Sequence, residues 1–206
     1  MAVERINYQA GETACTGALV YDDHVSGPRP LLLMSPNWLG VSDDSIKRAA
    51  TIACSKYVAF VADMYGGGKI PAGPPEAAPL ANGLRADAPA RRRRIAAALD
   101  ALRRESDKRK IGDLKRQAAV GFCFGGGNVL ELARAGADLQ AVICLHGDLI
   151  WMTWPMLFSS LIGCSFILEE AVNPESAKDS LRYPNPCIAH RMDRSCCAQR
   201  SSGSRQ

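Results

Sequence analysis

The chain has 206 residues, 47% of them hydrophobic and 22% charged, with a formal net charge of +4. This length favours one domain with a substantial core, and the composition is ordinary for a soluble globular protein rather than for a class with an unusual composition. Eight cysteines are present, and the first residues form no apolar leader. We therefore expect a reduced, cytoplasmic protein rather than a disulfide framework.

The first part of the chain predicts a lead-in followed by a βαβ unit. Residues 1–30 combine polar alternation with turn signals, which favours antiparallel strands. Continuous apolar runs at 31–34 and 58–62 are typical of strands buried on both faces. Between them, residues 46–57 predict a helix, with an N-cap in the segment 42–44.

A segment rich in Pro, Ala and Gly follows at 69–90, and we expect a surface excursion there. A helix is predicted over about 90–105, with apolar residues at helical spacing. Basic clusters at 91–94 and 103–110 fall on this helix. Acidic residues interleave with them and no aromatic platform accompanies them, so we interpret them as a solvated face and expect no nucleic-acid partner.

The later elements complete an alternating pattern. A strand at 117–122, a helix at 128–134 and a strand at 141–145 follow one another. Buried strands joined by helical crossovers predict an α/β fold with a doubly wound, mostly parallel sheet. Sites in such sheets form beyond the carboxyl ends of the strands. The loops at 37–38 and 63–65, Cys123 and His146 all hold such positions.

The turn after the third buried strand reads Gly121-Phe122-Cys123-Phe124-Gly125. This is the G-x-S-x-G nucleophile elbow with cysteine in the serine position. Glycines allow the sharp turn, and the N–H groups that open the next helix favour negative charge on a thiolate or an oxyanion. A dinucleotide-binding loop is disfavoured, because Cys123 occupies the place of the second glycine in G-x-G-x-x-G.

The elbow resembles the dienelactone hydrolase family, a branch of the α/β-hydrolase fold. Three further motifs match in order, so that the resemblance covers about residues 31–148: Asn37-Trp38-Leu39-Gly40, Ala62-Asp63-Met64-Tyr65-Gly66 and Leu145-His146-Gly147. The resemblance implies hydrolysis of small-molecule carboxylic esters or lactones without a cofactor.

The resemblance also implies roles for individual residues. Cys123 matches the nucleophile, and the backbone N–H groups of Phe124 and Trp38 match the oxyanion donors. Asn37 stands where the family carries a glutamate that contacts the resting thiol. Arg85 lies in the stretch from which the family takes an arginine that holds the substrate carboxylate. An amide cannot accept a proton as a carboxylate does, so Asn37 changes how the thiol is activated or which substrate is chosen.

The base that would activate Cys123 is not evident from the sequence. The chain contains His24, His146 and His190. His146 is interpreted as a rim histidine with satisfied hydrogen bonds, since its motif lies beside the site in the family but is not the family's base. Asp179 and His190 follow the order acid then base, but no buried strand precedes Asp179 to present it.

The remaining cysteines are expected to be structural or unassigned. Cys54 and Cys144 lie in apolar segments and are predicted to be inert core residues. A tail cluster of Cys187, His190, Cys196 and Cys197 lacks the paired spacing of zinc sites. We therefore expect no bound metal.

After residue 148 the family pattern stops. We divide the chain into a hydrolase domain at 1–148 and a divergent part at 149–206, which comprises an apolar segment and a disordered tail. The sheet is then expected to lack its last strands. Residues 149–168 carry no charge and are long enough to cross a membrane. A shifted reading frame or altered splice is favoured over a membrane anchor, which leaves three alternatives: an active esterase, a truncated pseudoenzyme and a membrane-tethered protein.

Overall fold

A computed structural model describes residues 1–147 and 166–169 of the chain. The chain divides into a unit at Met1–Glu170 and a second at Ala171–Gln206. The second unit lies outside the described residues. So do most of the uncharged segment 149–168 and the whole tail, including the Asp179–His190 pair and the tail cysteines. The predicted boundary at 148 and the disordered tail therefore stay predictions.

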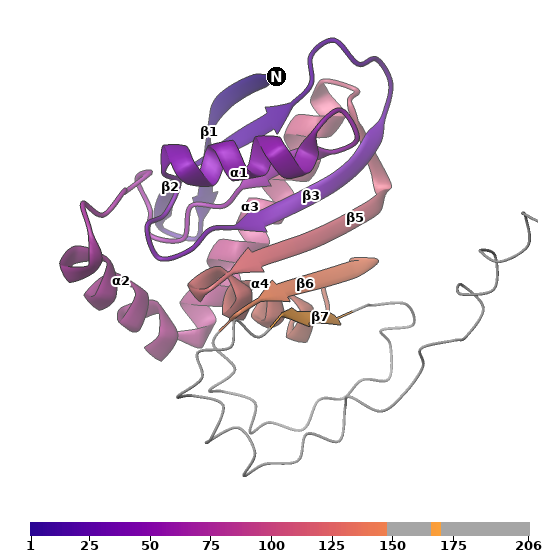
Figure 1. The fold of residues 1–206 in the computed structure, drawn as a ribbon. Helices are drawn as coiled ribbons and strands as arrows, with labels where there is room; N and C mark the ends of the chain where they lie inside the picture. The colour runs from indigo at the N-terminus through magenta and orange to yellow at the C-terminus, as the bar shows by residue number, and fades with distance from the viewer. Residues whose placement is uncertain (148–165, 170–206) are drawn as a thin grey trace, which may run out of the picture. The chain divides into compact units, whose positions relative to one another are not determined.

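One mostly parallel sheet forms the centre of the described unit (Figure 1). Its strand order is β1-β2-β4-β3-β5-β6-β7. Strands β1 and β2 pair antiparallel, as does β2 with β4, and every other neighbouring pair is parallel. The strands are β1 (Ala2–Ala10), β2 (Thr13–Tyr21), β3 (Arg29–Ser35), β4 (Val58–Val61), β5 (Gly112–Phe122), β6 (Ala141–Leu145) and β7 (Phe166–Glu169). The α/β class and the antiparallel lead-in are thus confirmed.

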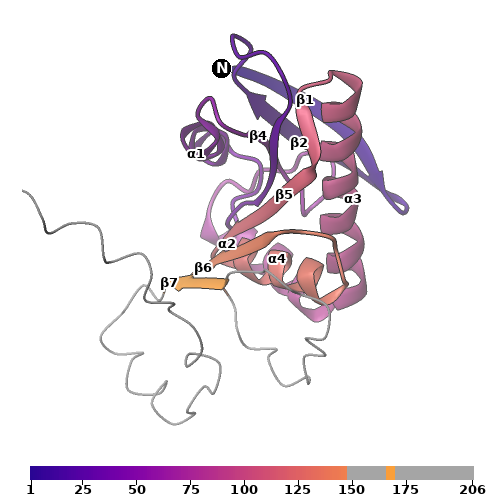
Figure 2. The same ribbon diagram turned by 90° about the vertical axis from the view of Figure 1, so that its right-hand side faces the viewer.

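Helices cover both faces of this sheet (Figure 2). They are α1 (Asp43–Ala53), α2 (Pro74–Ala86), α3 (Ala88–Lys108) and α4 (Phe124–Arg134). Helix α1 packs on one face over Val20, Met34 and Val61, while α3 and α4 close the main core on the other. The expected N-cap of α1 is present, because Ser42 Oγ accepts a hydrogen bond of 3.3 Å from the Ser45 N–H.

Three details differ from the sequence-based expectations. The Pro-rich stretch at 69–90 contains helix α2, which prolines open because they are favourable at the first helical positions. Arg91 is buried and only 3% exposed, so the 91–94 cluster is not wholly a solvated face. Cys54 is exposed at the end of α1 with φ 48°, whereas Cys144 is buried as predicted.

The sheet continues beyond the fourth buried strand. Strand β7, at residues 166–169, pairs in parallel with β6 and lies along its edge (Figure 1). It is a strand that the sequence pattern did not indicate, and it comes from the end of the uncharged segment. Among the described residues no helix is both long enough and apolar enough to cross a membrane.

Candidate active site

Cys123 occupies the turn between β5 and α4. Its φ of 53° and ψ of −120° are a conformation that side-chain-bearing residues rarely adopt. Two backbone hydrogen bonds of 2.9 Å hold the turn, from the Cys123 N–H to the Leu145 carbonyl and from the Gly126 N–H to the Cys123 carbonyl. Strain kept in place by surrounding contacts is typical of functional positions.

The glycines of the elbow are required by close backbone contact. A Cβ on Gly121 would stand 2.1 Å from the Gly125 carbonyl oxygen, and one on Gly125 would stand 2.1 Å from the Ser35 carbonyl oxygen. Helix α4 therefore meets both its own strand and the end of β3 through bare backbone. This contact sets the first turn of the helix against the loop that follows β3.

A buried polar network supports that contact from below. Arg91 donates from Nε to Asn128 Oδ1, and Asn128 Nδ2 donates over 3.0 Å to Ser35 Oγ. Arg91 also lies against Gly127, where a Cβ would come within 2.1 Å of its Nη2. A charge buried this deeply is tolerated only with hydrogen-bonded partners. The network links α3, α4 and β3 directly beneath the elbow.

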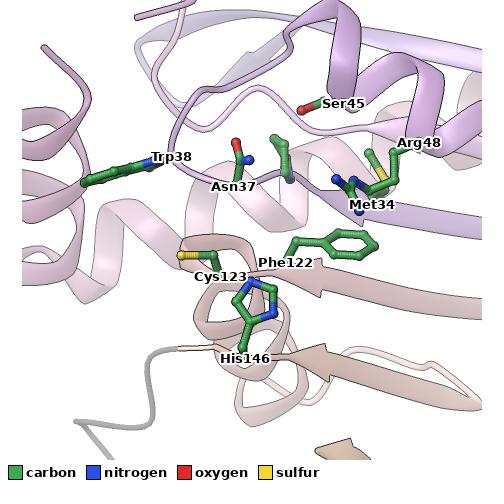
Figure 3. Close-up of a pocket in the computed structure, with 9 residues that line it drawn as sticks. Met34, Asn37, Trp38, Ser45, Arg48, Phe122, Cys123 and His146 are labelled. Atoms are coloured by element: carbon green, nitrogen blue, oxygen red, sulfur yellow. The ribbon is translucent and has the colours of Figure 1, made fainter. Parts of the chain in front are cut away.

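A cavity of about 210 Å³ opens above Cys123. Figure 3 shows residues from α1, the loop after β3, the elbow and the end of β6 arranged around it. Its lining consists of Met34, Pro36, Asn37, Trp38, Ser45, Arg48, Phe122, Cys123 and His146. The structure thus brings Cys123, Trp38 and Asn37 together, as the sequence predicts.

The backbone N–H groups of Phe124 and Trp38 are the expected oxyanion donors; Trp38 lines the cavity, and Phe124 follows Cys123 directly. Phe124 is the first residue of α4, where an N–H has no intrahelical partner. Within the described part of the chain, neither its N–H nor that of Trp38 has a hydrogen-bond acceptor. Such groups are available to a developing oxyanion, for which losing one donor typically costs about 2.7–4 kcal/mol.

Of the two predicted substrate-binding residues, Asn37 lines the cavity and Arg85 does not. Asn37 Oδ1 accepts a hydrogen bond of 3.0 Å from the Leu39 N–H and so caps its own turn. The Arg85 guanidinium lies 5.5 Å from the centre of the Phe124 ring and donates over 2.8 Å to Asn82. The structure therefore places the predicted substrate-binding arginine against the residue that follows Cys123 but not in the cavity.

Tyr65 connects the two loops of the site. Its hydroxyl donates over 2.8 Å to the Trp38 carbonyl, and its ring stacks on that of Phe124 at 5.9 Å. Burial raises the pKa of Tyr65 to about 12, so the hydroxyl stays protonated and can donate. The sequence placed Tyr65 on the rim of the sheet but gave no sign of this bridging contact.

Asp63 holds the loop that carries Tyr65. Its carboxylate accepts hydrogen bonds from four backbone N–H groups, those of Thr16, Tyr65, Gly66 and Gly68, at 2.7–3.0 Å. Both oxygens are therefore used by the backbone. Asp63 fixes the loop and is not placed to carry a proton during a reaction.

His146 follows β6 directly, with φ 41°, and its exposed side chain lines the same cavity as Cys123. Figure 3 shows its ring beside the elbow. Within residues 1–147 and 166–169, the His146 ring makes no hydrogen bond. This differs from the sequence-based expectation of a rim histidine with satisfied hydrogen bonds. A weak base therefore stands open to the cavity next to a thiol.

Arg48 and Ser45 reach the cavity from α1 and were not singled out by the sequence. Ser45 is occupied, because its Oγ donates over 3.0 Å to the Gly40 carbonyl. The guanidinium of Arg48 lies 4.9 Å from the centre of the Phe122 ring. The sequence predicts the helix that carries Ser45 and Arg48, but it does not show which side of that helix faces the site. That orientation depends on tertiary packing.

Comparisons with known proteins identify the family and the fold of this chain. The profile of the dienelactone hydrolase family matches residues 16–165, which contain the whole region of resemblance. A solved dienelactone hydrolase-like promiscuous phosphotriesterase from metagenomic libraries is 32% identical, with TM-score 0.71 over 88% of this chain and 75% of that one. The solved protein m3DLH is 31% identical with the same coverage and TM-score.

A more distant structure shows the same fold. Est1E from Butyrivibrio proteoclasticus is 16% identical, with TM-score 0.51 over 69% of this chain and 51% of that chain. A comparison with curated proteins gives no significant match.

Proposed function

The chain belongs to the dienelactone hydrolase family, and we propose that it hydrolyses small carboxylic esters or lactones with Cys123 as the nucleophile. The observation that carries this proposal is the elbow itself. Cys123 is held at φ 53° at the start of α4 and faces a cavity shared with an imidazole. The reaction requires no cofactor, because thiol, base and oxyanion donors all come from the chain.

The proposed reaction passes through a thioester. Cys123 Sγ loses its proton to His146, and the thiolate adds to the carbonyl carbon. The Phe124 and Trp38 N–H groups stabilise the negative oxygen. The C–O bond then breaks, and the alkoxide takes the proton from His146. Water, deprotonated by His146, attacks the thioester and releases the acid and the free thiol.

The test compares two cysteine variants. Purified chain is given p-nitrophenyl acetate, and nitrophenolate release is followed for wild type, Cys123→Ser and Cys54→Ser. Cys54 is the matched control, since its thiol is exposed but lies outside the cavity. We expect C123S to lose at least about 99% of kcat/KM, which corresponds to the roughly 10²-fold or larger effect of removing a nucleophile. Equal rates in C123S and wild type would reject Cys123 as the nucleophile.

The truncated-pseudoenzyme alternative predicts a different time course. Cys123 would be acylated once and no further product would form. Mass spectrometry of the intact protein during the same reaction distinguishes the two cases. Product in excess of enzyme supports the hydrolase, whereas a single stable acetyl adduct supports the pseudoenzyme.

A second candidate activity is phosphotriester hydrolysis. It is suggested by the phosphotriesterase that is 32% identical to this chain. An oxyanion site that stabilises a tetrahedral carboxyl intermediate also presents donors to a phosphoryl oxygen. The same three proteins should therefore be assayed with an aryl phosphotriester, for which activity that depends on Cys123 would extend the substrate range.

We further propose that the protein works in the cytoplasm. The described cysteines at 15, 54, 123 and 144 are all free thiols, which supports a reducing compartment such as the cytoplasm. Cell fractionation tests the membrane-tethered alternative. Recovery of the chain only in the soluble fraction would reject it.

A further inference from the structure

One side of strand β6 is only partly covered by the described residues. Burial alternates along the strand, because Val142 and Cys144 belong to the main core whereas Ile143 and Leu145 on the other side are partly buried. Figure 2 shows α1 on the side of the sheet opposite α3 and α4. Apolar side chains at the end of the sheet thus stay accessible beside α1.

A groove of about 610 Å³ lies between α1 and the ends of β5 and β6. Its helical wall runs from Asp44 to Ile52, a length of about 12 Å at 1.5 Å per residue. Phe122 and Leu145 contribute the opposite wall. Asp44 and Lys47 bring opposite charges to its exposed edge, while the other three side chains are apolar. Such a surface suits an uncharged, extended apolar chain.

The groove continues the cavity above Cys123. Phe122 and Arg48 line both the cavity and the groove, and in Figure 3 they lie together on one side of Cys123. Phe122 directly precedes Cys123 in the sequence, and Leu145 directly precedes His146. The groove therefore begins beside the thiol and the imidazole that the proposed reaction uses.

The imidazole determines which part of an ester lies nearest the groove. In the proposed reaction His146 returns its proton to the leaving alkoxide, so the leaving oxygen must stand within hydrogen-bond reach of His146. The N–H groups of Phe124 and Trp38 hold the carbonyl oxygen instead. The alcohol part of the ester, which is bonded to the leaving oxygen, is thus the part that can extend past His146 into the groove.

We propose that this groove binds the alcohol chain of the substrate, so that the protein prefers esters of long, unbranched, uncharged alcohols. This inference rests on the proposed function, because it names the substrate class of the same site. The reaction consumes one water and releases a short carboxylic acid and the alkyl alcohol through the thioester at Cys123. Ile52 and Leu145 act in it by binding the chain and take no part in the chemistry.

The first experiment uses two isomeric esters, hexyl acetate and ethyl hexanoate. They have the same formula and similar hydrophobicity, but they carry the long chain on opposite sides of the scissile bond. Acid release at constant pH gives kcat/KM for each ester in wild type, Ile52→Gln, Leu145→Gln and Leu114→Gln. Leu114 is the matched control for Leu145, because its exposed side chain lines neither the cavity nor the groove.

We expect wild type to prefer hexyl acetate by about tenfold or more. A fully buried methylene adds about fourfold to binding, and each added methylene of a hexyl chain would be only partly buried in an open groove. The preference should fall several-fold in I52Q and L145Q, which change opposite walls, and should stay at the wild-type value in L114Q. Either groove variant alone carries the test if the other does not fold.

A second experiment does not require turnover. Alkylation of Cys123 by N-hexylmaleimide is compared with alkylation by N-ethylmaleimide, which differ in chain length alone. Mass spectrometry of the tryptic peptide 117–134 reports the modification, because Cys123 is the one cysteine in that peptide. The hexyl-to-ethyl rate ratio should fall several-fold in I52Q and L145Q and not in L114Q.

The two readouts separate this inference from the proposed function. If the esters are turned over and the isomer preference is the same in wild type and both groove variants, the alcohol site is rejected while the hydrolase stands. If neither ester is turned over, the maleimide ratio decides. A fall in the groove variants alone supports the groove as a binding site without the proposed function, and an unchanged ratio rejects it.

Two other occupants of the groove give distinct results. A preference for ethyl hexanoate that is lost in I52Q and L145Q would place the acyl chain in the groove and overturn the proposal. Size-exclusion chromatography of the same proteins tests for a second copy of the chain. A smaller particle in I52Q, with both ratios unchanged, would mean that a second copy fills the groove and would equally overturn it.

Discussion

The phenolic hydroxyl of Tyr65 donates a hydrogen bond of 2.8 Å to the backbone carbonyl of Trp38. Because the Tyr65 ring also stacks on Phe124, this one side chain joins the loop after β3 to the first turn of α4. These two segments carry the proposed oxyanion donors. Their separation therefore depends on Tyr65 as well as on the main chain.

The variant Tyr65→Phe should lower ester hydrolysis while keeping the fold. It removes one hydrogen bond, whose net contribution is typically about 0.5–1.5 kcal/mol, and retains the ring that stacks on Phe124. We expect kcat to fall roughly 2- to 10-fold, with KM changed less, because the donors act on the transition state. Wild-type kcat in a variant of unchanged thermal stability would show that the Trp38 loop holds its position without this bond.

Two histidine variants test the assignment of the base. His146→Gln should reduce kcat/KM by about 10²-fold or more, the usual contribution of general acid–base catalysis. His190→Gln is the comparison, since His190 lies outside the described residues and satisfies the order acid then base. A greater loss in H190Q than in H146Q would transfer the role of base to His190 and give the tail after residue 170 a catalytic part.

Gly125→Ala should destabilise the protein, because the new Cβ would stand 2.1 Å from the Ser35 carbonyl oxygen. Overpacking of this kind typically costs about 1–3 kcal/mol, and rigid backbone on both sides favours the upper end. Gly83→Ala in α2 is the control, as a Cβ there meets nothing within 4 Å. It should stabilise by about 0.5–1 kcal/mol. Urea unfolding measures both, and equal stabilities would contradict the close contact at the elbow.

Acid should weaken a network that ties β1 to α3. Hydrogen bonds from Arg109 and Tyr21 lower the pKa of Glu4, and hydrogen bonds from Arg109 and Arg104 lower the pKa of Glu105. Groups with a depressed folded-state pKa contribute stability above their unfolded pKa, about 4.3 for Glu, and lose it as pH falls through the folded value.

The variant Arg109→Met tests this linkage. Its thermal midpoint should lie below that of wild type at pH 7, and the difference should shrink between about pH 5 and pH 3 as both carboxylates take up protons. A difference that is constant over this range would show that Arg109 stabilises by packing alone.

The sequence predicted the order of buried strands because four continuous apolar runs are short, separate and bounded by turn residues. It also predicted the elbow and the loop at 37–38, because both follow the end of a strand directly in the sequence. Helix α2 was not predicted, because prolines and glycines mark turns locally while Ala77 and Ala81 are buried only in the folded protein. Arg91 was assigned to solvent for a similar reason: its partner Asn128 is distant in sequence.

Part of the candidate site could be predicted from the sequence in the same way. Cys123, Trp38 and Asn37 follow strands directly, so topology alone brings them to one edge. Arg48 and Tyr65 depend on which way a helix turns and how a loop folds back. Such contacts are set by tertiary packing and leave no local pattern in the chain.

The cavity is built from segments far apart in the sequence, with Met34, Arg48, Cys123 and His146 contributed by different elements of the sheet and its helices. Strands β3, β5 and β6 must all pair before these groups meet. Pairing between distant segments is the slow part of folding. Recovery of esterase activity after dilution from denaturant should therefore lag behind the return of helical signal and follow completion of the central sheet.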